Sequence, residues 1–202
     1  MSHAPRSGHV RRETNETVIE AAVNLDGSGA CEVRTGIGML DHLIEQVARH
    51  ACFDITLLAH RSDLERDAHH LVEDAGIALG QALAGALGDR AGIVRMADAT
   101  VPMDEALALV ALDLSGRSYA ALDLAFAGER IGQLPTEMIE HFLWSFAQHA
   151  GLTLHVRLLA GRNDHHRAEA VFKALARALG AATRVDARLG GAVPSTKGVL
   201  GG

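Results

Sequence analysis

The sequence is poor in aromatic residues, in cysteine and in long apolar runs, and each shortage argues against a class of protein. Aromatic side chains make up 3% of the 202 residues, which argues against an extended surface for stacking nucleobases. Two cysteines, Cys31 and Cys52, are too few for a disulfide framework and lack metal-motif spacing, so we expect free buried thiols. No apolar run reaches the roughly 18 residues of a membrane-spanning helix, and the first ten residues carry no apolar signal region.

The charge is low and evenly spread. The formal net charge is −6, and no run of five or six like charges occurs, so the basic surface of a nucleic-acid-binding protein is missing. With 48% hydrophobic and 22% charged residues, the chain can bury a sizeable core in one large or two small domains. We therefore expect a cytoplasmic globular protein whose partners include neither nucleic acid nor a membrane.

Histidine, in contrast, is abundant, with 12 residues that cluster. The segment HHLVE at 69–73 returns as HHRAE at 165–169, so two adjacent histidines are twice followed by a glutamate at the same spacing. Chance alone rarely repeats such a pattern within one chain. The repetition points to a duplicated site.

Apolar periodicity predicts that the whole chain is an internally duplicated α+β fold. Each half shows two strands, a helix, a strand and a helix, a ββαβα order. The first half is predicted to hold strands at 17–25, 30–35 and 53–60 and helices at 38–50 and 69–88. The second half is predicted to hold strands at 106–114, 118–126 and 153–161 and helices at 135–150 and 165–180.

The two halves are expected to pack as one unit, because either half alone would leave a sheet face or a helix stripe exposed. The segment 89–100 joins them without a run of Pro, Gly or Ser. The predicted organisation is an N-terminal tail at 1–10, half-domains at 11–94 and 95–187, and a C-terminal tail at 188–202. That last tail looks flexible unless a ligand or neighbour holds it.

Each repeated motif is also a set of candidate metal ligands, because a histidine and a glutamate four residues on lie one helical turn apart. Imidazole and carboxylate suit Mn, Fe, Zn or Ni, and the absence of thiolate argues against a structural zinc site. If the halves pack about a pseudo-twofold axis, each site can take groups from both, with three imidazoles and one carboxylate per metal. The candidate ligands are His42, His69, His70, Glu73, His141, His165, His166 and Glu169.

Structural interpretations of the same residues stay open. Both double histidines follow an aspartate, so they fit solvated surface residues on an acidic helix or residues that cap a helix end. His42 and His141 each begin a helix after an acidic residue, a common place for a histidine without a ligand role. Their matched positions in the two halves favour a functional role.

Assembled in order, the motifs resemble the imidazoleglycerol-phosphate dehydratase family of histidine biosynthesis, from residue 11 to residue 200. Small departures from the family pattern, at Met39, Ala51 and Ala68, touch no proposed ligand. The chain is too short for a fused phosphatase domain, so a monofunctional enzyme is expected. The motifs that carry the resemblance are RRETNET, GIGMLDHLIEQVARH, DAHHLVEDAGIALG, MDEAL, DLSGR, HFLWSFAQHAGLTLH, NDHHRAEAVFKALARAL and PSTKG.

The resemblance implies a fold, a reaction and an assembly. The implied fold is a duplicated subunit of the ribosomal protein S5 domain 2-like kind, and the implied assembly is a 24-subunit homo-oligomer with active sites between subunits. The implied reaction is a hydro-lyase step that converts D-erythro-imidazole glycerol phosphate to imidazole acetol phosphate and water. Two Mn ions per active site would hold the substrate imidazolate between them, which gives a reason for a paired metal site.

The resemblance also assigns roles outside the metal ligands. Glu16 matches a substrate-contacting glutamate that we assign to proton transfer or hydroxyl binding, and His50 matches a second acid or base group. Together with His69, Glu73 and Glu169 they form the predicted catalytic group. The predicted substrate-binding residues, most of them on the phosphate side, are Glu16, Arg95, Arg117, Lys173, Ser195, Thr196 and Lys197.

Two other functions are compatible with a dinuclear site. A dinuclear metallohydrolase would release phosphate or amine from its substrate, whereas a dehydratase leaves the phosphoester intact. A metal-storage or metal-carrier protein would leave Glu16, Arg95 and Arg117 without a role.

Overall fold

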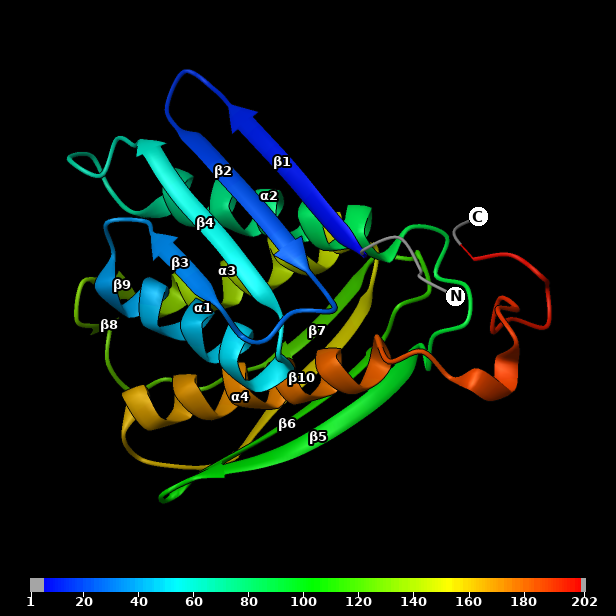
Figure 1. Ribbon diagram of the computed structural model, residues 1–202. Coiled ribbons are helices and arrows are strands. Elements are labelled where there is room, and N and C mark those ends of the chain that lie inside the picture. Colours follow the sequence, from blue (N-terminus) through cyan, green and yellow to red (C-terminus); the bar gives the residue numbers. More distant parts are fainter. Residues whose placement is uncertain (1–5, 201–202) are drawn as a thin grey trace.

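The computed structural model describes residues 6–200, and these form two half-domains of the same design (Figure 1). The first half contains β1 (Ser7–Glu13), β2 (Val18–Asn24), β3 (Cys31–Arg34), α1 (Gly38–Ala51), β4 (Asp54–Arg61) and α2 (His69–Leu87). The second half contains β5 (Met96–Met103), β6 (Ala106–Asp113), β7 (Tyr119–Asp123), β8 (Arg130–Ile131), β9 (Leu134–Pro135), α3 (Thr136–Ala150), β10 (Thr153–Ala160), α4 (Asp164–Ala182) and the 3-10 turn η1 (Ala187–Leu189).

The two four-stranded sheets share one topology. Their strand orders are β1-β2-β4-β3 and β5-β6-β10-β7, so strands at corresponding places in the sequence occupy corresponding places in the sheets. In each sheet three strands are antiparallel neighbours, and the last one, β3 or β7, runs parallel to its partner. The predicted internally duplicated α+β fold is confirmed.

The helices fill the middle of the molecule, and the two sheets form its outer layers (Figure 1). Helices α1 and α2 pack on the first sheet, α3 and α4 pack on the second, and the halves meet where α2 packs against α3 and α1 against α4. Most buried core residues are Ala, Leu, Val and Ile, as the shortage of aromatics requires. The interface between the halves is thus helix on helix.

Two glycines bring α2 and α3 unusually close. A Cβ atom on Gly76 would lie 2.9 Å from the carbonyl oxygen of Phe142, and one on Gly80 would lie 2.7 Å from that of Phe146. Both distances are too short for a real contact, so a larger residue at either position would force the helices apart. The spacing of α2 and α3 therefore depends on glycine.

The sequence prediction missed the first strand of each half. Residues 7–10, predicted as tail, form part of β1, and part of the connecting segment 89–100 forms β5. Both strands lie at a sheet edge, where their side chains alternate between exposed and half-buried and show little apolar periodicity. Pro102 in β5 fits an edge strand. Residues 1–5 of the predicted tail lie outside the described residues.

Two smaller expectations concern the cysteines and the membrane. Cys31 and Cys52 are free, but both are exposed, so the prediction of buried thiols is wrong. Cys31 lies on β3 at the edge of its sheet, and Cys52 follows α1 with a left-handed backbone (φ 60°). Within residues 6–200, no helix combines the length and apolar character that crossing a membrane requires.

Candidate metal centre

The repeated motifs lie at the starts of α2 and α4, where polar side chains accept the first backbone N–H groups of each motif. The N–H of His69 donates to the side chain of Asp67 at 2.6 Å, and the N–H of His165 donates to the side chain of Asn163 at 2.9 Å. Asn163 therefore caps α4, whereas Ala68 at the N-cap of α2 gives no side-chain cap and Asp67 accepts the first N–H of that helix instead. Capping does not explain the histidine side chains themselves, which remain available in the first turn of α2 and α4.

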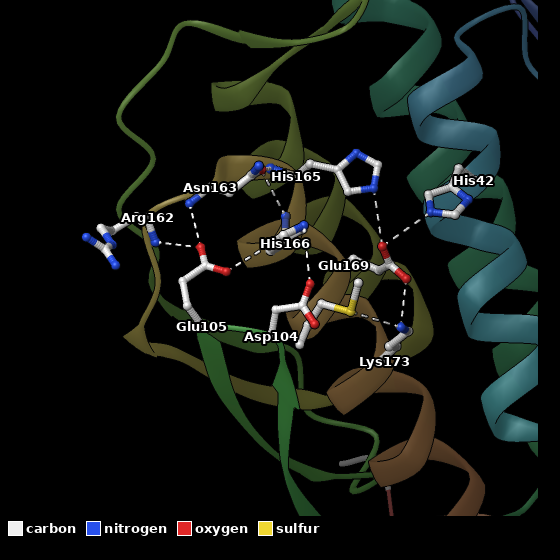
Figure 2. Close-up of polar contacts among 10 residues, drawn as sticks. His42, Asp104, Glu105, Arg162, Asn163, His165, His166, Glu169 and Lys173 are labelled. Atoms are coloured by element: carbon white, nitrogen blue, oxygen red, sulfur yellow. Dashed lines mark hydrogen bonds and ion pairs between the residues drawn. The ribbon is translucent and has the colours of Figure 1, made fainter.

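The first cluster, here called the α1–α4 cluster, consists of His42, His165 and Glu169. Glu169 Oε2 lies 3.2 Å from Nε2 of His165 and 3.5 Å from Nε2 of His42 (Figure 2). On the opposite side, Lys173 Nζ lies 2.7 Å from Glu169 Oε1. Burial acts to raise the pKa of Glu169, but Lys173 and His42 outweigh it and hold that pKa below its usual value. The cluster therefore contains a carboxylate anion at neutral pH.

The second cluster, the α2–α3 cluster, consists of His69, Glu73 and His141. Glu73 Oε1 lies 3.5 Å from Nε2 of His141, and its Oε2 lies 4.0 Å from Nε2 of His69. The two imidazole rings are 4.6 Å apart, centre to centre. As in the α1–α4 cluster, one half of the chain supplies a histidine and the other supplies a histidine and a glutamate.

Both clusters have the donors and the spacing for a divalent cation. In each, one potential ligand atom per residue lies within 4.8 Å of the other two. Nε2 of His42 and Nε2 of His141 are buried and have no hydrogen-bond partner within residues 6–200. Buried polar atoms are almost always paired, so an orphaned imidazole nitrogen 3.5 Å from a carboxylate fits a site for a metal ion.

The second histidine of each pair lies outside its cluster. The ring of His70 stands nearly perpendicular to that of His69, at 86°, and the ring of His166 to that of His165, at 82°. Among the described residues, the groups of ligand atoms that lie within 4.8 Å of one another include neither His70 nor His166. Each cluster within the chain thus has two imidazoles and one carboxylate, where the sequence prediction has three imidazoles.

Three acidic residues that the sequence analysis did not assign surround these outer histidines. Nδ1 of His70 lies 2.9 Å from Oδ2 of Asp63, and Nδ1 of His166 lies 2.8 Å from Oε2 of Glu105. Asp104 Oδ2 lies 3.7 Å from Nε2 of His166. The hydrogen bonds to Asp63 and Glu105 raise the pKa of both histidines. Two of these acids, Asp104 and Glu105, lie in the motif MDEAL at residues 103–107, but the sequence pattern gave them no role.

Glu16 and His50 lie in different surroundings. Glu16, in the turn between β1 and β2, is half-exposed, and its Oε1 lies 3.8 Å from Nε2 of His70. His50 lies near the end of α1, two turns beyond the α1–α4 cluster. Burial and the positive charges of Lys173 and Arg177 lower the pKa of His50, so its imidazole is neutral at pH 7.

The residues predicted on the phosphate side gather in one hollow, apart from Lys173. Nε and Nη2 of Arg95 donate to Asp113 at 2.7 and 2.9 Å, and its Nη1 donates to the carbonyl of Pro194 at 2.6 Å, which fastens the C-terminal tail. The hollow is lined by Arg95, Met96, Arg117, Pro194, Ser195, Thr196 and Lys197.

This hollow and the α1–α4 cluster lie at opposite ends of α4. The N–H of Arg95 donates to the carbonyl of Ala182 at the last residue of the helix, whereas His165 lies in its first turn. A helix of 19 residues is about 28 Å long. The hollow and the α1–α4 cluster of one chain therefore cannot contact the same small molecule.

Comparison with protein families gives a match over most of the chain. The family model described as "Imidazoleglycerol-phosphate dehydratase" matches residues 35–179. An imidazoleglycerol-phosphate dehydratase of Dehalococcoides mccartyi (strain CBDB1) is 53% identical over 195 residues, which cover 96% of this chain and 97% of that protein. The enzyme of the same name from Roseiflexus sp. (strain RS-1) is 54% identical over 200 residues, or 99% of this chain and 100% of that protein.

Solved structures give the same result. The crystal structure of imidazoleglycerol-phosphate dehydratase from Staphylococcus aureus subsp. aureus N315 has a TM-score of 0.80 and 32% identity, covering 89% of this chain and 99% of that one. The Pyrococcus furiosus protein, solved in complex with (S)-C348, has a TM-score of 0.80 and 35% identity, covering 95% and 100%. The likeness extends over nearly the whole fold.

Proposed function

The chain belongs to the imidazoleglycerol-phosphate dehydratase family, and we propose that it converts D-erythro-imidazole glycerol phosphate to imidazole acetol phosphate and water in histidine biosynthesis. The observation that carries the proposal is the pair of clusters, each with two imidazoles and one carboxylate drawn from both halves of the chain. A substrate that contains an imidazole ring offers two ring nitrogens, one for each metal position.

We infer that each cluster holds one Mn ion. His42, His165 and Glu169 would hold one ion and the α2–α3 cluster would hold the other. His70 and His166 would each supply the third imidazole of an ion at a neighbouring subunit's cluster. When bound, the ions supply Lewis acidity to the substrate ring and so make the neighbouring carbon easier to deprotonate. The buried, anionic Glu169 supplies negative charge that offsets the charge of an ion at its cluster.

Proton transfer is assigned to residues beside the clusters. Glu16 is half-exposed and lies at the edge of the centre next to His70, so it can accept a proton from the substrate or bind its hydroxyl group. His50 has a lowered pKa and is neutral at pH 7, which suits a base.

The phosphate end of the substrate needs a second copy of the chain. The hollow that contains Arg95, Arg117 and Lys197 supplies cations and hydroxyl groups for a phosphate, yet it lies one helix length away from the α1–α4 cluster of the same chain. We therefore propose that it completes the site of a neighbouring subunit, in a cytoplasmic homo-oligomer of 24 subunits. Lys173, 2.7 Å from Glu169, would contact the substrate from the metal side.

The same centre also suits a dinuclear metallohydrolase. That enzyme would use two metal positions to activate water and would release inorganic phosphate. A metal-storage function would leave the half-exposed Glu16 and the cationic hollow without a role.

The test is to incubate the assembled, Mn-loaded protein with imidazole glycerol phosphate and to measure ketone product and inorganic phosphate together. Ketone without phosphate release supports the dehydratase. Phosphate release supports the hydrolase, and metal-loaded, assembled protein that forms neither product contradicts both enzymes.

A further inference from the structure

We propose that Asp63 and Glu105 are positioning residues, which fix the ring orientation and the tautomer of His70 and His166 so that each presents Nε2 to a metal ion. The inference rests on the proposed function, because it presumes that both outer histidines bind metal when the centre is complete. It concerns residues to which neither the resemblance nor the sequence pattern gave a role.

The two contacts have the same geometry. In both, a carboxylate oxygen accepts from Nδ1, at 2.9 Å for Asp63 and His70 and at 2.8 Å for Glu105 and His166. A neutral imidazole that donates its Nδ1–H keeps its lone pair on Nε2, the nitrogen left to bind a metal. Metal-bound histidines commonly have such a partner, which orients the ring and increases the basicity of the ligand nitrogen.

Glu105 is held rigidly in place by the start of α4. Its Oε1 accepts the N–H groups of Arg162 at 3.0 Å and Asn163 at 2.8 Å, and this leaves Oε2 for His166 (Figure 2). The preceding residue, Asp104, has a positive φ of 47° in the tight turn between β5 and β6, which Asp tolerates better than most residues. The carboxylate therefore has a fixed direction before any metal binds.

Asp63 is fixed by burial instead. Its side chain is about one-tenth exposed, in the loop between β4 and α2, and its other carboxylate oxygen, Oδ1, is buried without a hydrogen-bond partner in the part of the chain described. A buried carboxylate anion is destabilising unless a hydrogen-bond partner or an opposite charge compensates for its lost hydration. The contact of its Oδ2 with Nδ1 of His70, at 2.9 Å, compensates for this burial.

The two carboxylates come from different places in the duplicated fold. Asp63 follows β4, whereas Glu105 lies in the hairpin between β5 and β6, the counterpart of the β1–β2 turn. Duplication alone would have placed both in the same loop. The same Nδ1 contact made by unrelated residues indicates that the contact itself is required.

The direct test is the Mn affinity of Asp63→Asn and Glu105→Gln, measured by calorimetry on the assembled, metal-free protein. Each variant is expected to lose about 10- to 100-fold in affinity. Matched controls are Asp123→Asn and Glu32→Gln, exposed carboxylates of the outer strands that pair with arginines and should leave the affinity unchanged.

A double-mutant cycle separates positioning from general stability. In a His70→Ala background the Asp63→Asn change should have no further effect on Mn affinity, whereas in a His166→Ala background it should keep its full effect. Glu105→Gln should behave in the reverse way. If Glu105→Gln unfolds because the start of α4 is loosened, the Asp63 cycle alone decides.

The outcomes distinguish this inference from the proposed function. Wild-type protein that binds no Mn contradicts the proposed metal centre. Wild-type protein that binds Mn while both variants bind it equally well overturns the positioning role, as does an Asp63→Asn effect that persists undiminished in the His70→Ala background.

Discussion

Histidine and glutamate side chains four residues apart contribute to both candidate metal clusters of this molecule. Glu169 accepts contacts from His42, His165 and Lys173, whereas Glu73 lies between two histidines without a lysine. The two carboxylates thus have different charge environments. Their shared geometry still predicts one metal ion for each.

Replacing Glu73 or Glu169 with Gln should each remove roughly one Mn ion per chain, because the change deletes the only negative ligand of a three-residue cluster. Metal content of the purified protein, measured by atomic emission after dialysis, checks this. Glu32→Gln is the control. Unchanged metal content would remove the substituted glutamate from the ligand set.

The hydrogen bonds of Asp54 predict how the stability of the fold changes with pH. Backbone N–H groups of Ser28 and Ala30 donate to its Oδ1 at 2.8 and 3.0 Å and lower its pKa below the ordinary 3.8. A lowered folded-state pKa stabilises the fold above pH 3.8, and this contribution disappears as the pH falls through the folded-state pKa.

The metal-free wild type should therefore melt at a higher temperature than Asp54→Asn at pH 6, and the difference should shrink as the pH falls below 3.8. Melting curves of both proteins, with chelator present at each pH, measure it. A difference that stays constant between pH 6 and pH 3 contradicts the assignment.

At the scale of elements, the centre depends on how closely the helices of the two halves pack. Helices α2 and α3 carry the α2–α3 cluster, and Gly76 and Gly80 let them approach to contact distance. Helix α1 packs against α4 in the same way and carries the other cluster. A change in either helix spacing would separate ligands from opposite halves.

Gly80→Ala should destabilise the protein by about 1–3 kcal/mol, because its new Cβ overlaps the carbonyl oxygen of Phe146. It should also weaken metal binding at the α2–α3 cluster more than at the other. Gly38→Ala is the matched control: its Cβ meets nothing within 4 Å, so stability should stay equal or rise by up to about 1 kcal/mol. Denaturant unfolding that shows equal effects for both variants would contradict this packing.

Most of the elements could be predicted from the sequence, because buried helices and central strands have clear apolar periodicity. β1 and β5 could not, since edge strands with exposed and half-buried side chains lack that pattern. The short hairpin of β8 and β9 is likewise too brief for a periodic signal. Apolar periodicity therefore shows which face of an element is buried more reliably than it shows whether a segment belongs to a sheet.

At the scale of the whole molecule, the internal duplication explains why the two clusters have the same composition. Two equal halves related by helix-on-helix packing bring a histidine from one half to a histidine and glutamate of the other, twice. The sequence repeats identified these candidate ligands, because helical spacing is local. It could not show that His70 and His166 lie outside the clusters, or that they contact Asp63 and Glu105, because those contacts depend on loops that fold back over the helix starts.

The distance along α4 leads to a prediction about assembly. If the phosphate hollow serves a neighbouring subunit, Glu73→Gln and Lys197→Ala chains should each be nearly inactive alone, and Lys197→Ala should keep its metal. Random co-assembly of the two should restore activity at about a quarter of the sites, if each site draws on two chains. Steady-state rates after dissociation and reassembly test this, and no recovery in mixed assemblies would mean that the residues do not come from different chains.

The central claim is that the two clusters hold the metal ions of the enzyme, and anomalous diffraction at the Mn edge from crystals of the Mn-loaded protein tests it most directly. The predicted result is two peaks per chain, one bounded by His42, His165 and Glu169 and the other by the residues of the α2–α3 cluster. Mn-loaded crystals with no peak at either cluster, or with peaks only elsewhere, would contradict it.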